Sequence, residues 1–140
     1  MRTVVIALAV CLLVASSLSS ASANLNQFAG RWENTDPKTG GLTRLEISVI
    51  GTKVKVHAYG YCEPSDCDLG EVEGVAYAPS VDSNLTETAK AITVKYTDGE
   101  RIMVIRPAES NRLQVETFTR FSDKSGRADY MAVYTFSRSN

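Results

Sequence analysis

Three side chains that could bind a metal ion or react with one another lie near the middle of the chain. They are His57, the single histidine, and Cys62 and Cys67, each five positions after the one before. A structural zinc site needs about four ligands, often from cysteine pairs two to four residues apart. The sequence after residue 23 holds no further cysteine or histidine. We therefore expect no metal site and no cofactor here, and instead a disulfide between Cys62 and Cys67.

The residues between the cysteines favour a closed loop. Pro64 and the Ser65-Asp66 pair are common turn formers, and cysteines this far apart in sequence can come within bonding distance across a turn. Such a small loop contributes roughly 2 kcal/mol in the chain-entropy account of disulfides. The bond would pin the tip of a hairpin.

Five carboxylates stand in and after this loop: Glu63, Asp66, Asp68, Glu71 and Glu73. Calcium takes six to eight oxygen ligands, but its twelve-residue loop with the D-x-D-x-D-G pattern is missing from the sequence. Clusters of charged side chains usually remain in water. We expect an acidic, solvated patch, with Glu71 and Glu73 on one face of a strand.

His57 is the candidate general base, because no other side chain titrates near neutral pH without a perturbed pKa. Strand alternation places it on the face opposite Val54 and Val56, and therefore outside a barrel that buries the valines. The sequence also lacks a nucleophile motif such as G-x-S-x-G. We assign no catalytic residue.

The N-terminus has the parts of a cleaved secretory signal. Met1 and Arg2 give a positive start, residues 3–15 are apolar, and Ala21-Ser22-Ala23 resembles a cleavage site. The apolar run is shorter than the roughly 20 residues that span a bilayer. We expect residues 1–23 to be removed, residues 24–140 to form a single domain, and the protein to be secreted, either extracellular or periplasmic, without a membrane anchor. That oxidising compartment favours the disulfide.

The mature chain has the pattern of short strands joined by tight turns. Residues 42–49 and 53–61 alternate apolar with polar side chains, which is typical of half-buried strands. Asp98-Gly99 is a two-residue hairpin signal. The strands are expected at residues 28–34, 42–49, 53–61, 70–77, 91–97, 100–107, 112–121 and 128–138.

Eight antiparallel strands in sequence order leave two unpaired edges unless the sheet closes. Eight is also about the number at which side chains can fill a barrel or surround one small ligand. The sequence therefore predicts an all-β fold, an eight-stranded antiparallel up-and-down β-barrel. A two-sheet β-sandwich is the alternative.

The first strand carries Gly30-Arg31-Trp32, which resembles the G-x-W opening signature of the calycin barrels, including lipocalins and avidins. "GRWEN" is similar to the G-x-W-x-N start of avidins. The resemblance implies that Trp32 closes one barrel end and that a basic residue of the last strand, Arg138, lies over its indole face. Avidins line their biotin site with several tryptophans, whereas this chain has one, so biotin binding is not implied.

"FAGRW", residues 28–32, is also similar to the start of small periplasmic inhibitors of bacterial metalloproteases. In those barrels an N-terminal tail enters the protease cleft. Residues 24–27 would be the corresponding tail here.

Two further features concern modification and partners. Asn84-Leu85-Thr86 is a candidate N-glycosylation site in a eukaryotic secretory route. The last strands are apolar on both faces, so we expect a homo-oligomer through the C-terminal strands unless a loop covers the outer face. Acidic and basic residues nearly balance, 16 against 15, and are interspersed. This argues against nucleic acid and anionic membranes as partners.

These features predict a secreted, non-enzymatic calycin-like barrel that binds a small or apolar ligand in its mouth, or a partner on its surface. A second hypothesis is a protein-interaction module, such as a protease inhibitor or an extracellular matrix protein, with a packed interior. A third is a barrel enzyme, which would need a titratable side chain inside the cavity. The sequence names neither the ligand nor its binding residues.

Overall fold

The computed structural model of the chain describes residues 24–96 and 100–140. Residues 1–23, where the signal peptide is predicted, lie outside the described residues, and so does the predicted Asp98-Gly99 turn. No helix in the two described segments is long and apolar enough to cross a membrane.

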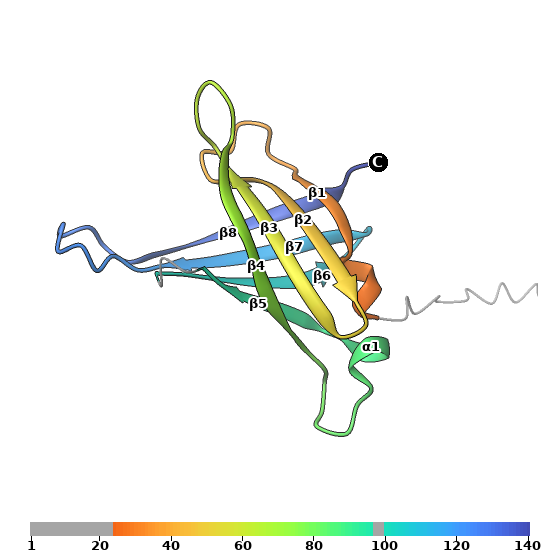
Figure 1. The fold of residues 1–140 in the computed structure, drawn as a ribbon. Coiled ribbons are helices and arrows are strands. Elements are labelled where there is room, and N and C mark those ends of the chain that lie inside the picture. Colours follow the sequence, from red (N-terminus) through yellow and green to blue (C-terminus); the bar gives the residue numbers. More distant parts are fainter. Residues whose placement is uncertain (1–23, 97–99) are drawn as a thin grey trace, which may run out of the picture.

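Eight antiparallel strands form a closed barrel in which each strand pairs with its neighbours in sequence and β1 pairs with β8 (Figure 1). The predicted fold is therefore confirmed. The strands are β1 (Gly30–Asn34), β2 (Leu42–Ile50), β3 (Lys53–Gly60), β4 (Cys67–Tyr77), β5 (Ala91–Lys95), β6 (Arg101–Ala108), β7 (Arg112–Thr119) and β8 (Tyr130–Arg138). Two one-turn helices, η1 (Leu25–Phe28) and α1 (Leu85–Thr88), complete the elements.

The N-terminal segment differs from its prediction. The resemblance to the protease inhibitors implied a tail at residues 24–27, but these residues belong to η1 and its cap, with the Asn24 side chain accepting a hydrogen bond from the Gln27 backbone N–H at 3.0 Å. Leu25 is 1% exposed and Phe28 is fully buried. Burial of these two apolar side chains holds the segment against the barrel, so β1 begins at Gly30 and not at residue 28.

β4 also begins earlier than predicted. The sequence placed its start at residue 70, where the alternation becomes regular. In the structure Cys67 already pairs with Gly60 and Asp68 with Tyr59, so the strand begins at the second cysteine. The β3–β4 register is irregular between His57 and Tyr59, which interrupts the alternation that the sequence prediction relied on.

Alternation along the strands sends every second side chain into the barrel. In β3, Val54, Val56 and Ala58 are buried, while Lys53 and Lys55 are exposed. The inward side chains of the eight strands pack with η1 into one apolar core. The largest space that opens into the barrel interior beside this core lies toward the end opposite η1, where Leu42, Thr117 and Thr119 line it.

Trp32 closes the end of the barrel where β1 begins. Its indole N–H donates to the backbone oxygen of Phe28 at 2.8 Å, and the side chain is 1% exposed. Arg138, its cross-strand partner in β8, places its guanidinium carbon 4.2 Å from the centre of the indole ring. The same guanidinium donates to the backbone oxygens of Gln27 and Ala29. One side chain thus joins the last strand to the indole and to η1.

Gly30 makes this arrangement sterically feasible. Its φ of 127° lies in the left-handed half of conformational space, which side chains rarely adopt. A Cβ atom at this position would also collide with the guanidinium of Arg138. Because Gly30 has no side chain, the guanidinium of Arg138 can pass it and reach the backbone of η1.

Replacing Arg138 with methionine tests how much this contact stabilises the closed barrel. We expect the free energy of unfolding to fall by about 2 kcal/mol, because the cation–π contact and the charge-assisted hydrogen bonds are lost while an apolar stem remains. Arg120→Met is the matched control, since the Arg120 side chain is 80% exposed. Urea denaturation measures both variants. An Arg138→Met variant as stable as the control would contradict this role.

Candidate functional site

The open end of the barrel lies opposite Trp32. Because neighbouring strands run in opposite directions, the loops at residues 35–41, 61–66 and 120–129 all lie at this end. In Figure 1 residues 61–66 form the yellow-green loop at the top, and residues 120–129 form the blue loop that projects to the left between β7 and β8. A cavity of about 230 Å³ opens among these elements. We call it the mouth cavity.

Cross-strand rows place polar side chains around the mouth cavity. Arg101 of β6 pairs with Thr119 of β7, which pairs with Tyr130 of β8, and all three line the cavity. One row deeper, Thr117 pairs with Met103, which is fully buried. The interior therefore changes from polar at the mouth to apolar toward the closed end.

The opposite wall of the cavity is apolar. It is formed by Leu42 of β2, Gly60 of β3 and Leu69 of β4. Gly41 faces Tyr134 so closely that a Cβ atom on the glycine would overlap the phenol ring. A small molecule in the cavity would therefore meet hydroxyl and guanidinium groups on one side and hydrocarbon on the other.

Arg101 is the single side chain with a formal charge at neutral pH among the described residues that line the cavity. It is partly buried. Within residues 24–96 and 100–140 its side chain has no hydrogen bond and no ion pair. Glu100, the neighbour in sequence, lines a separate groove on the outer wall of the barrel. The mouth cavity thus carries one cation that no described carboxylate neutralises.

Thr119 brings a hydroxyl group into this row without a protein partner for it. The residue is 8% exposed, and its Oγ1 has no hydrogen bond within the described part of the chain. A buried polar group without a hydrogen bond costs about 1–3 kcal/mol relative to a satisfied one. Because a rotation about χ1 exchanges hydroxyl and methyl, the Oγ1 of Thr119 can reach an acceptor that enters the cavity.

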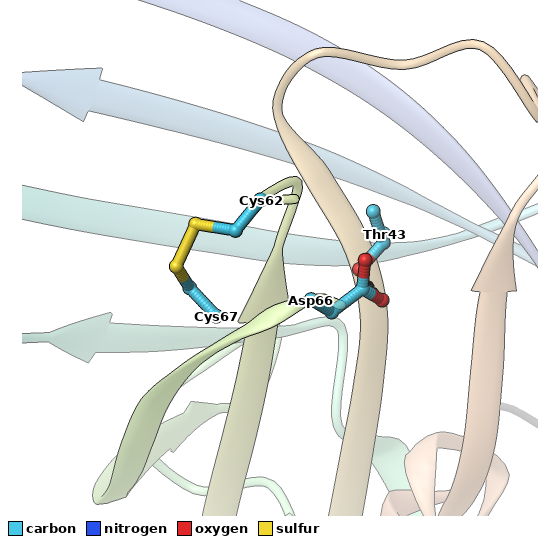
Figure 2. The surroundings of a disulfide bond; sticks show 4 residues. All are labelled: Thr43, Cys62, Asp66 and Cys67. Atoms are coloured by element: carbon cyan, nitrogen blue, oxygen red, sulfur yellow. Dashed lines mark hydrogen bonds between the residues drawn. A yellow bond between two sulfur atoms is a disulfide. The ribbon is translucent and has the colours of Figure 1, made fainter. Parts of the chain in front are cut away.

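The predicted disulfide lies on the rim of the mouth cavity. Cys62 and Cys67 are bonded with their Cα atoms 5.4 Å apart, and both line the cavity. Figure 2 shows the disulfide on one side of the loop and Asp66 on the other, facing Thr43. Asp66 accepts a hydrogen bond from the Thr43 hydroxyl at 2.6 Å. The loop is thus closed by a covalent bond and attached to β2.

Tyr61 continues this attachment to the neighbouring loop. Its backbone N–H donates to the Gly41 oxygen at 2.8 Å. Its phenol donates to the carboxylate of Glu63, and this hydrogen bond raises the pKa of the Tyr61 hydroxyl. Two neighbouring loops of the rim are therefore held together.

His57 lies on the outer wall of the barrel, as the alternation predicted, and away from the mouth cavity. Its Nε2–H donates to a carboxylate oxygen of Asp68 at 2.6 Å, and the ring stacks on Tyr59 with centroids 4.6 Å apart. This hydrogen bond is the main cause that lowers the pKa of Asp68, with the Gly70 backbone N–H adding to it. Arg44 covers the other ring of the stack, 3.6 Å from the Tyr59 centroid. These contacts are those of a surface cluster.

The acidic residues near the cysteines do not converge on one point. Glu63, Asp66 and Asp68 each accept a hydrogen bond from a different side chain, and Glu71 pairs with Lys55 at 3.0 Å. Glu73 is exposed on the same strand as Glu71. In the described part of the chain no group of three or more histidine, cysteine and acidic side chains is arranged to hold a metal ion.

Asn84 lies at the opposite end of the molecule, where it caps α1. Its side-chain oxygen accepts hydrogen bonds from the backbone N–H of Thr86 at 3.1 Å and from the Thr86 hydroxyl at 2.8 Å. The residue is exposed. Its glycosylation stays a prediction.

Sequence reasoning did not find Arg101 and Thr119. Thr117 and Thr119 occupy the positions in β7 where alternation puts Leu113 and Val115 inside. Two threonines at consecutive inward positions were therefore a usable signal of a polar lumen near the end of this strand. The sequence could not show that Arg101 stands in the same row, because the pairing register fixes that.

Replacing Thr119 with valine tests the unpartnered hydroxyl. We expect the free energy of unfolding to rise by about 1 kcal/mol, because valine fills a similar space and leaves no buried donor without an acceptor. Thr135→Val, at a partly exposed position in β8, is the control and should change stability little. Thermal and urea denaturation measure both. A loss of stability in Thr119→Val would mean that the hydroxyl has a stabilising partner.

Comparison with known proteins identifies no relative of this chain. No family model matches it, and neither the curated proteins nor the solved structures contain a significant match. The closed eight-stranded antiparallel barrel is compatible with a calycin-like fold.

Proposed function

We propose that this protein is a secreted carrier, without enzymatic activity, that binds a small organic molecule in the mouth of a calycin-like barrel. The observation that carries the proposal is the mouth cavity, which combines one polar wall, one apolar wall and a rim fixed by a disulfide. Ligand sites of proteins are typically apolar hollows with a few placed polar groups. The predicted signal sequence and the disulfide support the compartment.

The size of the cavity limits the ligand. At about 230 Å³ it is smaller than the 300–1,000 Å³ typical of sites for drug-sized molecules. Side chains fill the interior below it, with Met103, Ile105 and Val115 all fully buried. The ligand is therefore a fragment-sized molecule held near the opening and not a long chain threaded through the barrel.

A neutral probe, 3-phenylpropan-1-ol, tests the mouth cavity as a binding site. We expect a dissociation constant on the order of 1 mM, from about ten non-hydrogen atoms at about 0.4 kcal/mol each. Amide shifts in NMR spectra should concentrate at Leu69, Thr117 and Tyr134. Leu69→Trp should abolish binding because the indole fills the cavity.

Val75→Trp is the matched control for this experiment. It makes the same kind of change in the same strand, at a side chain that is 57% exposed on the outer wall. Binding should survive in this variant. Shifts spread over the outer wall, or equal binding by both variants, would contradict the proposed site.

A protein-interaction role is the second candidate, favoured by the outer face of the C-terminal strands. Ile102, Phe118 and Met131 form a cross-strand row on this face and are 45%, 43% and 52% exposed. Val133, 53% exposed, extends the patch along β8. An exposed apolar patch of this kind is typical of an interface. The buried N-terminal segment gives no support to a tail that enters a protease, so the role would belong to this outer face.

The occupant we propose for this face is a second copy of the chain. The apolar row lines a groove that also carries two basic residues, Lys95 and Arg120, and two acidic residues, Glu100 and Asp129. In a dimer with a two-fold axis, basic residues of one copy can therefore face acidic residues of the other. A loop over the face was the alternative, but these side chains remain exposed in the described structure.

Light scattering coupled to size exclusion measures this association. At tens of micromolar we expect the mass of a dimer, and Met131→Glu should give a monomer because it places two like charges in an apolar contact. Val81→Glu is the control, since Val81 is fully exposed in a loop at the other end of the barrel. A monomeric unaltered protein throughout this concentration range would refute the dimer.

A further inference from the structure

We propose that the ligand of the mouth cavity is a small amphiphilic carboxylate, with its carboxylate on Arg101 and its hydrocarbon part against the wall of β2 to β4. This inference rests on the proposed function and adds the chemical class of the ligand. Three observations carry it: the charge of the cavity, the hydroxyl groups beside that charge, and the division between its two walls.

The first observation is the uncompensated guanidinium of Arg101. A partly buried cation loses part of its hydration, and a nearby anion can offset that loss. The two carboxylates of the disulfide loop are already hydrogen-bonded, Glu63 to Tyr61 and Asp66 to Thr43, and Glu100 and Asp129 line the groove on the outer wall. Glu63 and Asp66 line a separate hollow together with their hydrogen-bond partners Tyr61 and Thr43. An anion that enters the mouth cavity would therefore meet one positive charge and no described negative charge in its lining.

The second observation is the position of the threonines. Thr119 is the direct cross-strand neighbour of Arg101, and Cβ atoms of such pairs lie about 4.5–5.5 Å apart. A carboxylate that accepts two hydrogen bonds from the planar guanidinium can also accept one from a hydroxyl at this distance. Thr117, which is 4% exposed, lines the cavity one row deeper. The Oγ1 of Thr119, without a protein partner, would gain an acceptor.

The third observation is the apolar wall opposite. Leu42 and Leu69 face the cavity from β2 and β4, and Gly60 keeps the space between them open. A Cβ atom at Gly60 would lie within ordinary contact distance of Leu69, 3.5 Å from its methyl group. A purely ionic ligand such as an inorganic anion would leave this wall in contact with water. A hydrocarbon group attached to the carboxylate covers it, and apolar burial adds to the affinity.

The experiment compares two probes that share a phenylpropyl group, 3-phenylpropanoate and 3-phenylpropan-1-ol, at neutral pH and low salt. We expect the acid to bind the full mature chain about tenfold more tightly than the alcohol, the difference that one charge-assisted contact makes. Arg101→Gln should weaken the acid about tenfold and leave the alcohol nearly unchanged. Arg101→Lys should restore part of the difference, because it keeps the charge but not the two-pronged geometry.

Arg120→Gln is the matched control, because it removes an arginine from the outer groove and not from the mouth cavity. It should change neither dissociation constant. The readout is the set of amide shifts around the cavity, measured together with the affinities for every variant.

Three results would overturn this inference, and they differ in what they leave of the proposed function. If the alcohol binds at the mouth as tightly as the acid, or if Arg101→Gln weakens both equally, the carboxylate class is overturned and the mouth site stands. If neither probe shifts the mouth amides, the site and the carboxylate inference are both overturned. Acid-dependent shifts confined to the outer groove near Lys95 and Arg120 would also overturn the inference.

Discussion

The contact between Trp32 and Arg138 is the constraint on which the barrel depends. A meander of eight strands closes only if its first and last strands pair, and these two residues are the cross-strand pair at that seam. The guanidinium of Arg138 lies over the indole and also donates to the backbone at η1. The same side chain therefore takes part both in the seam between β1 and β8 and in covering one end of the barrel. This contact requires a glycine at position 30, because a Cβ atom there would collide with the guanidinium of Arg138. With one end sealed, the opposite end is left as the entrance.

The entrance has a rim held by covalent and hydrogen bonds, and polar side chains without protein partners inside it. The rim loops are fixed by the bond between Cys62 and Cys67, by the hydrogen bond from Thr43 to Asp66, and by the backbone contact from Tyr61 to Gly41. A preformed rim reduces the ordering cost of binding. Inside it, Arg101 and Thr119 place a charge and a hydroxyl where an apolar side chain would give a more stable core. Natural proteins accept such local losses of stability mainly at functional sites.

Strand alternation predicted the eight strands, and the cost of two unpaired sheet edges predicted their closure, which the resemblance of Gly30-Arg31-Trp32 to the calycin signature also implied. Alternation failed where packing overrides a local pattern: Leu25 and Phe28 are buried in a helical turn that period-two reading cannot find, and an irregular register moved the start of β4 to Cys67. The site was harder to predict for a different reason. Alternation tells which face a residue such as Thr119 occupies, but its depth along the barrel depends on the stagger between strands, which brings Arg101 beside it.

The cross-strand row of Arg101, Thr119 and Tyr130 at the ends of β6, β7 and β8 has a consequence for how the molecule would respond to its surroundings. Thr119 of β7 and Tyr130 of β8 are a cross-strand pair, and both line the mouth cavity and also the groove on the outer wall. A shift of either side chain under an occupant of one space alters the shape of the second space. The proposed ligand binding at the mouth and the proposed dimerisation would then be thermodynamically linked, each changing the affinity of the other by the same factor.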